Sequence, residues 1–297
     1  MLYLVTAILP TPVAYIVADR RLDLSIAILD ISMLHLHEET IPELMNYLAR
    51  AINADAYIKH PIIVDQKSLV VLDGVHRVAA LGKIGVRRVP ACLVDYGNSA
   101  IQVLSWYRTI TNSSNADKIL GQIKKTDCTL ESTEEKPEHL IGVSPTVAAL
   151  LFRSQTFLVN HPFRHLQEAY DVIGRIEERL TGAGFKVRYE AQQDALENLR
   201  RKLASAVLCT PTISKEEIIK SALSKRIFAW KATRHVIPAR PLSVNAPLIL
   251  LRDRNKSLSQ VNDGLRHLLK ERKLRRLPAG SVVDGRRYEE ELYVFEE

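Results

Sequence analysis

The chain has few cysteines and little that would suit a membrane. Its 297 residues include only Cys92, Cys128 and Cys209, which lie far apart and in no metal-binding spacing. We therefore expect reduced, mostly buried thiols in a cytoplasmic protein, and neither a disulfide framework nor a zinc site. The apolar run over residues 1–17 carries no charge and is interrupted by two prolines, which argues against a signal peptide and a membrane helix. We predict instead two strands joined by a proline turn.

Repeats, low-complexity tracts and a helix-turn-helix pattern are also missing from the sequence. The formal net charge of +7 is modest, and it suits an anionic ligand as well as nucleic acid. The length allows one large domain or two ordinary ones. Residues 111–138 are polar and rich in charged pairs, so we predict that this stretch joins two lobes, residues 1–110 and residues 111–297.

The most informative segment is the run over residues 70–81, which reads as a buried strand, a tight turn and the start of a helix. A helix that begins at a glycine turn presents backbone N–H groups to an anion. Arg77 adds a planar fork for phosphate or carboxylate oxygens, and Asp73 suits Mg²⁺. The plain structural alternative is a turn glycine at Gly74, a helix cap, and solvent-exposed side chains at His76 and Arg77.

The pattern Asp-Gly-x-His-Arg at residues 73–77 stands between segments 61–65 and 88–96, which also read as strands. This arrangement resembles the ParB/sulfiredoxin-like fold, and within it the free L-serine kinases resemble far more of the chain. The resemblance implies an α/β (α+β) protein with a ParB/sulfiredoxin-like N-terminal lobe and a second mixed α/β lobe that completes the active-site cleft. The blocks that carry the resemblance are residues 36–39, 58–64, 73–77, 105–108, 233–242 and, more weakly, 285–295.

The resemblance also implies an activity. Free L-serine kinases convert L-serine to O-phospho-L-serine with a nucleotide donor and Mg²⁺, which here would supply cysteine biosynthesis. Both ATP and ADP suit a turn that grips two phosphates, so the donor stays open. The expected partners are these small molecules, with no nucleic acid and no membrane. The residues expected to bind the nucleotide are Asp73, Gly74, Val75, His76, Arg77, Thr233, Arg234 and His235. Asp73 is also expected to be a catalytic residue and the metal ligand.

A kinase of this kind needs a group that accepts the proton of the serine hydroxyl. By resemblance this general base is Glu38, and Glu39 is its rival because a shift of one residue in the alignment would exchange the two. We predict that Thr40 and Glu43 form a capping box for the helix that follows, which leaves Glu38 free to act. The structural alternative for either carboxylate is a charge that complements the helix dipole.

Serine itself needs a cation for its carboxylate and an acceptor or a ring face for its ammonium group. Trp106 and Arg108 are residues of suitable type and spacing for this pocket, although a core position is the commoner fate of a tryptophan. Lys59 and His60 precede a strand and are expected to face the same cleft. Arg240 lies in a proline-stiffened loop, and we also assign it to substrate binding.

Two other classes of protein share the motif. A ParB-like DNA-binding or nuclease protein is the main alternative, and it would be expected to add a helix-turn-helix module. A sulfiredoxin-like reductase would need a reactive cysteine inside the phosphate turn, where this chain has Val75. Both readings are therefore weaker than that of a kinase.

Overall fold

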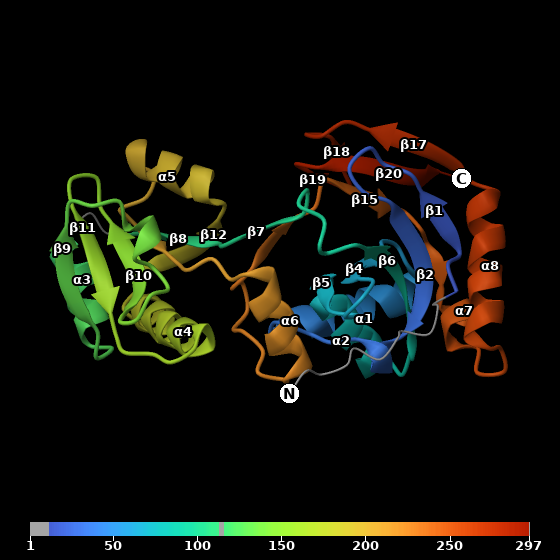
Figure 1. Cartoon of the computed structure of the whole chain (residues 1–297), viewed down its shortest axis with the longest axis horizontal. Coiled ribbons are helices and arrows are strands. Elements are labelled where there is room, and N and C mark those ends of the chain that lie inside the picture. The colour runs from blue at the N-terminus through green and yellow to red at the C-terminus, as the bar shows by residue number, and fades with distance from the viewer. Residues whose placement is uncertain (1–11, 113–115, 297) are drawn as a thin grey trace. The chain divides into compact units, whose positions relative to one another are not determined.

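The computed structural model describes residues 12–112 and 116–296, which form two compact units (Figure 1). The first unit contains residues 1–102, 219–225 and 235–297, and the second contains residues 103–218 and 226–234. The predicted boundary at residue 110 with a continuous second lobe is therefore wrong, because the chain returns to the first unit for its last 63 residues. Most of the predicted N-terminal strand pair lies outside the described residues.

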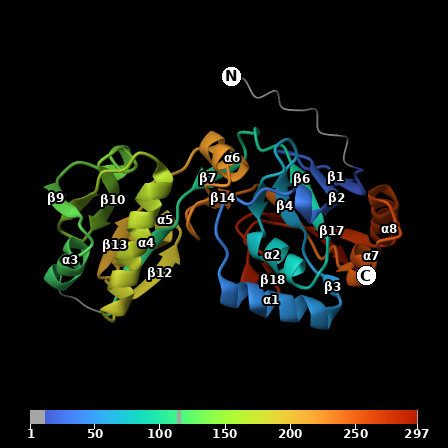
Figure 2. The same cartoon turned by 90° about the horizontal axis from the view of Figure 1, so that it is seen from below.

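The first unit is built on a five-stranded sheet with strand order β1-β2-β6-β4-β5. Strands β4 and β6 run parallel, and the other neighbouring pairs run antiparallel. Helices α1 and α2 pack on each other, and α8 (Leu258–Lys270) lies along β2 (Figures 1 and 2). The elements of this unit up to residue 102 are β1 (Tyr15–Val17), β2 (Leu24–Asp30), the short helix η1 (Ile31–Met33), α1 (Pro42–Asp55), β3 (Tyr57–Ile58), β4 (Ile62–Asp65), β5 (Val71–Asp73), α2 (Val75–Lys83) and β6 (Arg88–Val94).

The C-terminal part of the first unit adds a three-stranded sheet of order β15-β20-β17 and a short hairpin. Its elements are β15 (Ala239–Leu242), β16 (Ala246–Pro247), α7 (Leu248–Arg252), α8 (Leu258–Lys270), β17 (Lys273–Leu277), β18 (Val282–Val283), β19 (Arg286–Arg287) and β20 (Glu291–Glu296). The buried Asn262 on α8 accepts a hydrogen bond from the Ile28 amide at 2.7 Å and donates one to the Ile28 carbonyl at 3.1 Å. This amide side chain ties the C-terminal helix to the backbone of β2.

The second unit is a six-stranded antiparallel sheet of order β12-β8-β13-β10-β11-β9. Helices α3 and α4 pack on each other, and α5 lies on the opposite face of the sheet from α4 (Figures 1 and 2). The elements are β8 (Tyr107–Thr111), α3 (Ala116–Lys124), β9 (Thr129–Thr133), the short helix η2 (Pro137–His139), β10 (Thr146–Leu151), β11 (Thr156–Asn160), α4 (Leu166–Gly182), β12 (Lys186–Glu190), α5 (Gln192–Arg200) and β13 (Ala206–Cys209).

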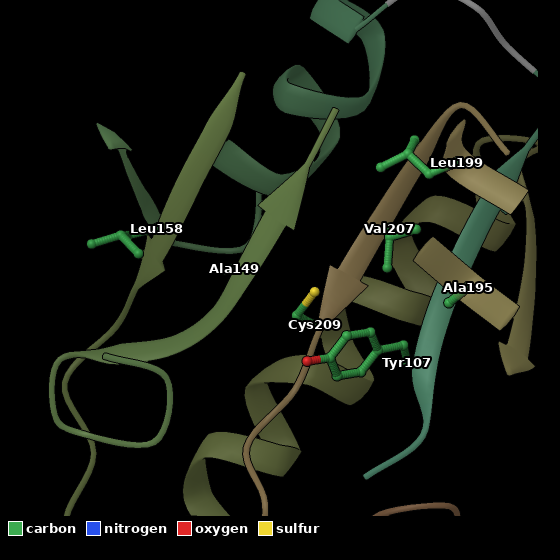
Figure 3. Packing of buried hydrophobic residues seen from close by; sticks show 7 residues of the cluster. All are labelled: Tyr107, Ala149, Leu158, Ala195, Leu199, Val207 and Cys209. Carbon is green, nitrogen blue, oxygen red and sulfur yellow. The ribbon is translucent and has the colours of Figure 1, made fainter. Parts of the chain in front are cut away.

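Alternate residues of the central strands supply the core under α5 (Figure 3). Tyr107 from β8, Val207 and Cys209 from β13 and Ala149 from β10 all point to this face, where Leu199 of α5 packs. The strand period of two then turns the intervening residues toward α4. Because both faces of the sheet are covered, these strands carry few polar residues, and the few that they carry have partners within the unit.

Several elements differ from the predictions. The polar stretch over residues 111–138 is not a loose join, because it holds α3 and β9 of the second unit. The elements β7 (Gln102–Leu104), α6 (Lys215–Leu223) and β14 (Arg234–Val236) instead lie where the chain passes between the units. Over residues 12–112 and 116–296, none of the helices has the length and apolar composition needed to cross a membrane.

Candidate active site

The strand, turn and helix predicted around Gly74 are all present. Strand β5 ends at Asp73, Gly74 has a φ of +103°, and α2 begins at Val75. A Cβ atom on Gly74 would lie 2.6 Å from Cγ2 of Ile62 and 2.9 Å from Nη2 of Arg77. The turn therefore needs glycine both for its left-handed backbone and for its close contact with β4.

Asp73 is the centre of an ion-pair cluster at this turn. Its Oδ2 atom accepts hydrogen bonds from Nη1 of Arg240 at 2.7 Å and from Nη2 of Arg77 at 3.1 Å. Arg240 also pairs with Glu290, and Arg77 donates from Nη1 to the Pro61 carbonyl at 2.6 Å. Burial by itself would raise the pKa of Asp73, but the Arg240 and Arg77 guanidinium groups outweigh it and hold that pKa well below its usual range. Asp73 is thus a carboxylate, held in place by two cations.

Asp73 is the residue predicted to bind Mg²⁺. No cluster of three or more His, Cys, Asp or Glu side chains that could hold a metal occurs within the described part of the chain. A protein that binds Mg²⁺ together with nucleotide phosphates needs only one or two carboxylates, since phosphates and waters supply the other ligands. With Oδ2 paired to the arginines, Asp73 has its Oδ1 atom left for such a shared ion, so the site fits Mg²⁺ brought by a nucleotide.

Glu38 lies beside the same strand. The His35 amide donates to the Leu69 carbonyl at 3.0 Å, and the Val71 amide donates to the His35 carbonyl at 2.9 Å, so this segment runs parallel to β5. That direction brings Glu38 toward the end of β5 at which Asp73 stands. Glu38 is 8% exposed, whereas Glu39 is open to solvent. The burial difference favours Glu38 over its rival as the group that faces the site.

A histidine pair lies next to Glu38. Nδ1 of His37 donates to the Val71 carbonyl at 2.8 Å, and its Nε2 stands 3.8 Å from Oε1 of Glu38. Burial lowers the pKa of His37, which favours the neutral ring. The His235 ring packs edge-on against that of His37 at 5.3 Å between centroids, and its Nε2 is 2.8 Å from the Tyr96 hydroxyl. His235, predicted from its block alone, thus lies beside the Glu38 segment in the first unit.

The start of α1 corrects one prediction. The helix begins at Pro42 with Ile41 in the cap position, and no side chain caps it, so the predicted box of Thr40 and Glu43 is wrong. Proline has no backbone N–H that would need a partner at the first helical position, and the residue before it, Ile41, is extended and takes the cap position. Thr40 therefore lies one residue before the cap position, where the box would have required it to be the cap. The Ile41 amide instead donates to Nε2 of His76 at 2.9 Å. That nitrogen of His76 therefore holds α1 against the turn and is not available to a phosphate.

A cavity of about 280 Å³ opens beside the arginine cluster, within the first unit. Its cationic side holds Arg77 and Arg240, and its other side is formed by apolar positions of α1 and β3. This combination suits a ligand with an anionic end and a flat, largely apolar end. The residues that line it are Leu48, Ala51, Ile52, Asp55, Tyr57, Ile58, Lys59, His60, Pro61, Ile63, Arg77, Arg240, Pro241, Leu242, Arg286 and Tyr288.

Sequence reasoning missed two of the charged residues around this cavity, Arg286 and Asp284. Arg286 lines it, and the Asp284 carboxylate pairs with Lys59 at 2.7 Å and with His60 at 3.3 Å. Burial, with the nearby Arg77 charge second, lowers the pKa of His60 to about 4, so this ring is neutral at pH 7. The signals in the sequence were the Asp-Gly pair at residues 284–285, which predicts a hairpin turn but no charge partner, and the weak resemblance of the block 285–295, which includes Arg286.

The remaining predicted site residues belong to the second unit. Nζ of Lys231 lies 4.1 Å from the Trp106 ring centre, and the Arg234 guanidinium lies 5.5 Å from it, so this tryptophan is the core of a small cation–π cluster. Thr233, between these two cations in sequence, is buried. Trp106 is only partly buried, and a role in binding serine stays a prediction.

Arg108 has a different environment. It is 2% exposed and its Nε donates to Oε1 of Glu177 at 2.6 Å, while the Tyr189 hydroxyl donates to the other oxygen of Glu177 at 2.5 Å. The guanidinium also donates to the Trp106 carbonyl at 2.5 Å. Its charge is therefore neutralised inside the second unit, so this geometry does not support the prediction that Arg108 holds the serine carboxylate.

Comparison with known proteins finds several L-serine kinases and also a ParB-like protein of Sulfolobus acidocaldarius, which is 24% identical over 200 residues and covers 67% of this chain and 84% of that relative. No protein-family profile matches the chain. It is 27% identical over 236 residues to an ATP-dependent L-serine kinase of Staphylothermus marinus, covering 74% of this chain and 89% of the relative. An ADP-dependent L-serine kinase of Thermococcus kodakarensis is 21% identical over 216 residues, with 71% and 87% covered. A solved free serine kinase in complex with AMP matches with a TM-score of 0.64 at 19% identity, covering 76% of this chain and 93% of that one. The predicted resemblance and the mixed α/β fold class are thus confirmed.

Proposed function

We propose that this protein is a free L-serine kinase, a nucleotide-dependent phosphotransferase that converts L-serine to O-phospho-L-serine. The observation that carries the proposal is the cluster of Asp73, Arg77 and Arg240 at the glycine turn, with the buried Glu38 on the segment beside β5. Similarity in sequence to ATP- and ADP-dependent L-serine kinases supports it. The product would serve cysteine biosynthesis.

The nucleotide would bind in the cavity beside the turn. Its phosphates would meet Arg77 and Arg240, whose guanidinium groups neutralise charge that builds up on the transferred phosphoryl group. The apolar positions of α1 and β3 would contact the base. Asp73 would hold the Mg²⁺ that accompanies the nucleotide, and the ion would supply positive charge that neutralises the phosphates. The backbone N–H groups at the start of α2 complete the anion site.

Glu38 would act on the serine hydroxyl. As the hydroxyl oxygen attacks the phosphorus, the bond to the nucleotide's bridging oxygen breaks and the Glu38 carboxylate takes the hydroxyl proton. Because Glu38 is mostly shielded from water, its carboxylate has few hydrogen bonds to water that must be broken when serine binds. The neighbouring His37, neutral and bonded to β5, limits the positions that the Glu38 side chain can take.

A direct assay tests the proposal. Purified protein is incubated with Mg²⁺, L-serine and either ATP or ADP, and phosphoserine is measured by mass spectrometry. We expect phosphoserine with at least one donor, and none when Mg²⁺ is chelated. A folded protein that made no phosphoserine with either donor would overturn the proposal. In that case, binding of DNA duplexes would test the ParB-like alternative.

A further inference from the structure

The hairpin of β18 and β19 brings the Asp284 carboxylate into contact with Lys59 and His60, two basic residues that line the cavity. Asp284 and Gly285 form its turn with φ values of +51° and +75°, as a two-residue turn between such strands requires. From this turn the two oxygens of Asp284 reach different partners, Nζ of Lys59 at 2.7 Å and Nε2 of His60 at 3.3 Å. Asp284 itself does not line the cavity, whereas both of its partners do.

Both partners are oriented for an anion. Nδ1 of His60 accepts a hydrogen bond from the Ser243 amide at 3.0 Å, so the proton of the neutral ring is on Nε2, which faces Asp284. Lys59 is 43% exposed, and its pairing with Asp284 raises the pKa of its ammonium group, so it is a full cation. A phosphate oxygen would find in these two groups the same donors that Asp284 now uses.

We propose that Asp284 is an internal competitor of the nucleotide, a carboxylate that holds Lys59 and His60 until phosphate oxygens displace it. The inference rests on the proposed function, since it names a regulator of that nucleotide site. The cavity lining carries the cations Lys59, Arg77, Arg240 and Arg286 and the single carboxylate of Asp55. Asp73 already pairs with Arg77 and Arg240, and Glu290 pairs with Arg240, so displacement of Asp284 from Lys59 and His60 would add two further donors for a polyphosphate, while the bound carboxylate weakens phosphate binding at these two residues.

The substitution Asp284→Asn tests the competition without disturbing the hairpin. Asparagine is at least as well accepted as aspartate before glycine in a turn of this type, so the backbone keeps its conformation. Loss of the carboxylate releases Lys59, and we expect ADP and ATP to bind roughly 3- to 10-fold more tightly, the range of one or two partly exposed ion pairs. Adenosine, which has no phosphate, should bind both proteins equally.

Two further variants separate the competitor from other effects. Lys59→Met combined with Asp284→Asn should lose most of the gain, because the released cation is gone. Asp253→Asn is the matched control, since this partly exposed carboxylate also pairs with a lysine, Lys256 at 3.3 Å, but lies outside the cavity lining. It should leave nucleotide affinity unchanged.

Isothermal titration calorimetry with ADP, ATP and adenosine distinguishes the outcomes. If the unaltered protein binds ADP or ATP and Asp284→Asn binds them no more tightly, the competitor is refuted while the kinase proposal stands. An equal gain for adenosine would also refute it, because the effect would then not depend on phosphate. If the unaltered protein binds neither nucleotide, both proposals fail.

Discussion

Arg240 and Asp73 are separated by 167 positions in the chain, and in the folded protein their side chains form an ion pair of 2.7 Å. Arg240 pairs at the same time with Glu290, on the segment before β20. The glycine turn therefore depends on the C-terminal segment for the orientation of its carboxylate. The five-residue motif at residues 73–77 therefore needs Arg240 and Glu290, from the C-terminal part of the sequence, to form its ion-pair cluster.

Replacement of Glu38 tests the general base. Glu38→Gln keeps the shape of the side chain and removes its charge, and we expect turnover to fall by about 10²–10⁴-fold. Nucleotide affinity should change little, because the carboxylate acts on serine. Glu39→Gln is the control, since its side chain is open to solvent and should leave turnover near normal. Loss of turnover in Glu39→Gln alone would reassign the base, and normal turnover in both would contradict the mechanism.

Gly74→Ala tests the backbone of the turn. A methyl group at a φ of +103° and 2.6 Å from Ile62 should destabilise the protein by about 2–4 kcal/mol, from backbone strain and overpacking together. Gly82→Ala in the same helix meets no atom within 4 Å, and it should instead be neutral or stabilise by up to about 1 kcal/mol. Urea unfolding of both variants measures the difference. Equal effects would mean that the turn is not constrained as described.

Arg77→Ala tests the phosphate site. We expect nucleotide binding to weaken by about 1.5–3 kcal/mol, the range of charge-assisted hydrogen bonds. Arg88→Ala is a matched control, because Arg88 also donates to two backbone carbonyls, those of Asp253 and Lys256, each at 2.7 Å, and lies outside the cavity lining. Fluorescence titration with a nucleotide analogue gives both affinities. A similar loss in Arg88→Ala would point to general destabilisation.

His60 should make stability depend on pH. Its pKa is about 4 in the folded protein and near 6.5 in an exposed histidine, so the unfolded chain binds the proton more readily between these values. The stability that this neutral ring contributes is complete above pH 6.5 and is lost as the pH falls toward 4, by up to roughly 3 kcal/mol. His60→Gln should therefore lose less stability than the unaltered protein over this range in urea unfolding. Parallel pH profiles would contradict the assignment.

Trp106 and Arg108, two positions apart, should respond differently to substitution. Trp106→Ala should raise the KM for serine more than that for the nucleotide if the ring face binds the serine ammonium group. Arg108→Met leaves the partly buried Glu177 carboxylate without its cation and should cost up to about 3 kcal/mol of stability. Steady-state kinetics and thermal unfolding separate the two. Unchanged serine kinetics in a well-folded Trp106→Ala would remove this residue from the site.

The sequence by itself determined the elements whose signals are local. The strand, glycine turn and helix around Gly74 are present as predicted, because a left-handed backbone and a short apolar run are set by adjacent residues. The hairpin turn at residues 284–285 likewise follows from an adjacent Asp-Gly pair. The capping box at Thr40 failed for a local reason as well, since Pro42 changed where the helix begins.

Tertiary structure decided which charges meet. Arg108 and Arg240 are both arginines near motif residues, yet one neutralises Glu177 in a core and the other holds Asp73 beside a cavity. The Asp-Gly pair at residues 284–285 predicts a turn but no charge partner, and only the folded hairpin brings Asp284 to Lys59. A buried or partly buried charge is stable only when it has a partner of opposite charge. Which partner it meets depends on the order of the strands in the sheets and on the return of the C-terminal segment to the first unit. Neither can be deduced from the spacing of motifs or from composition.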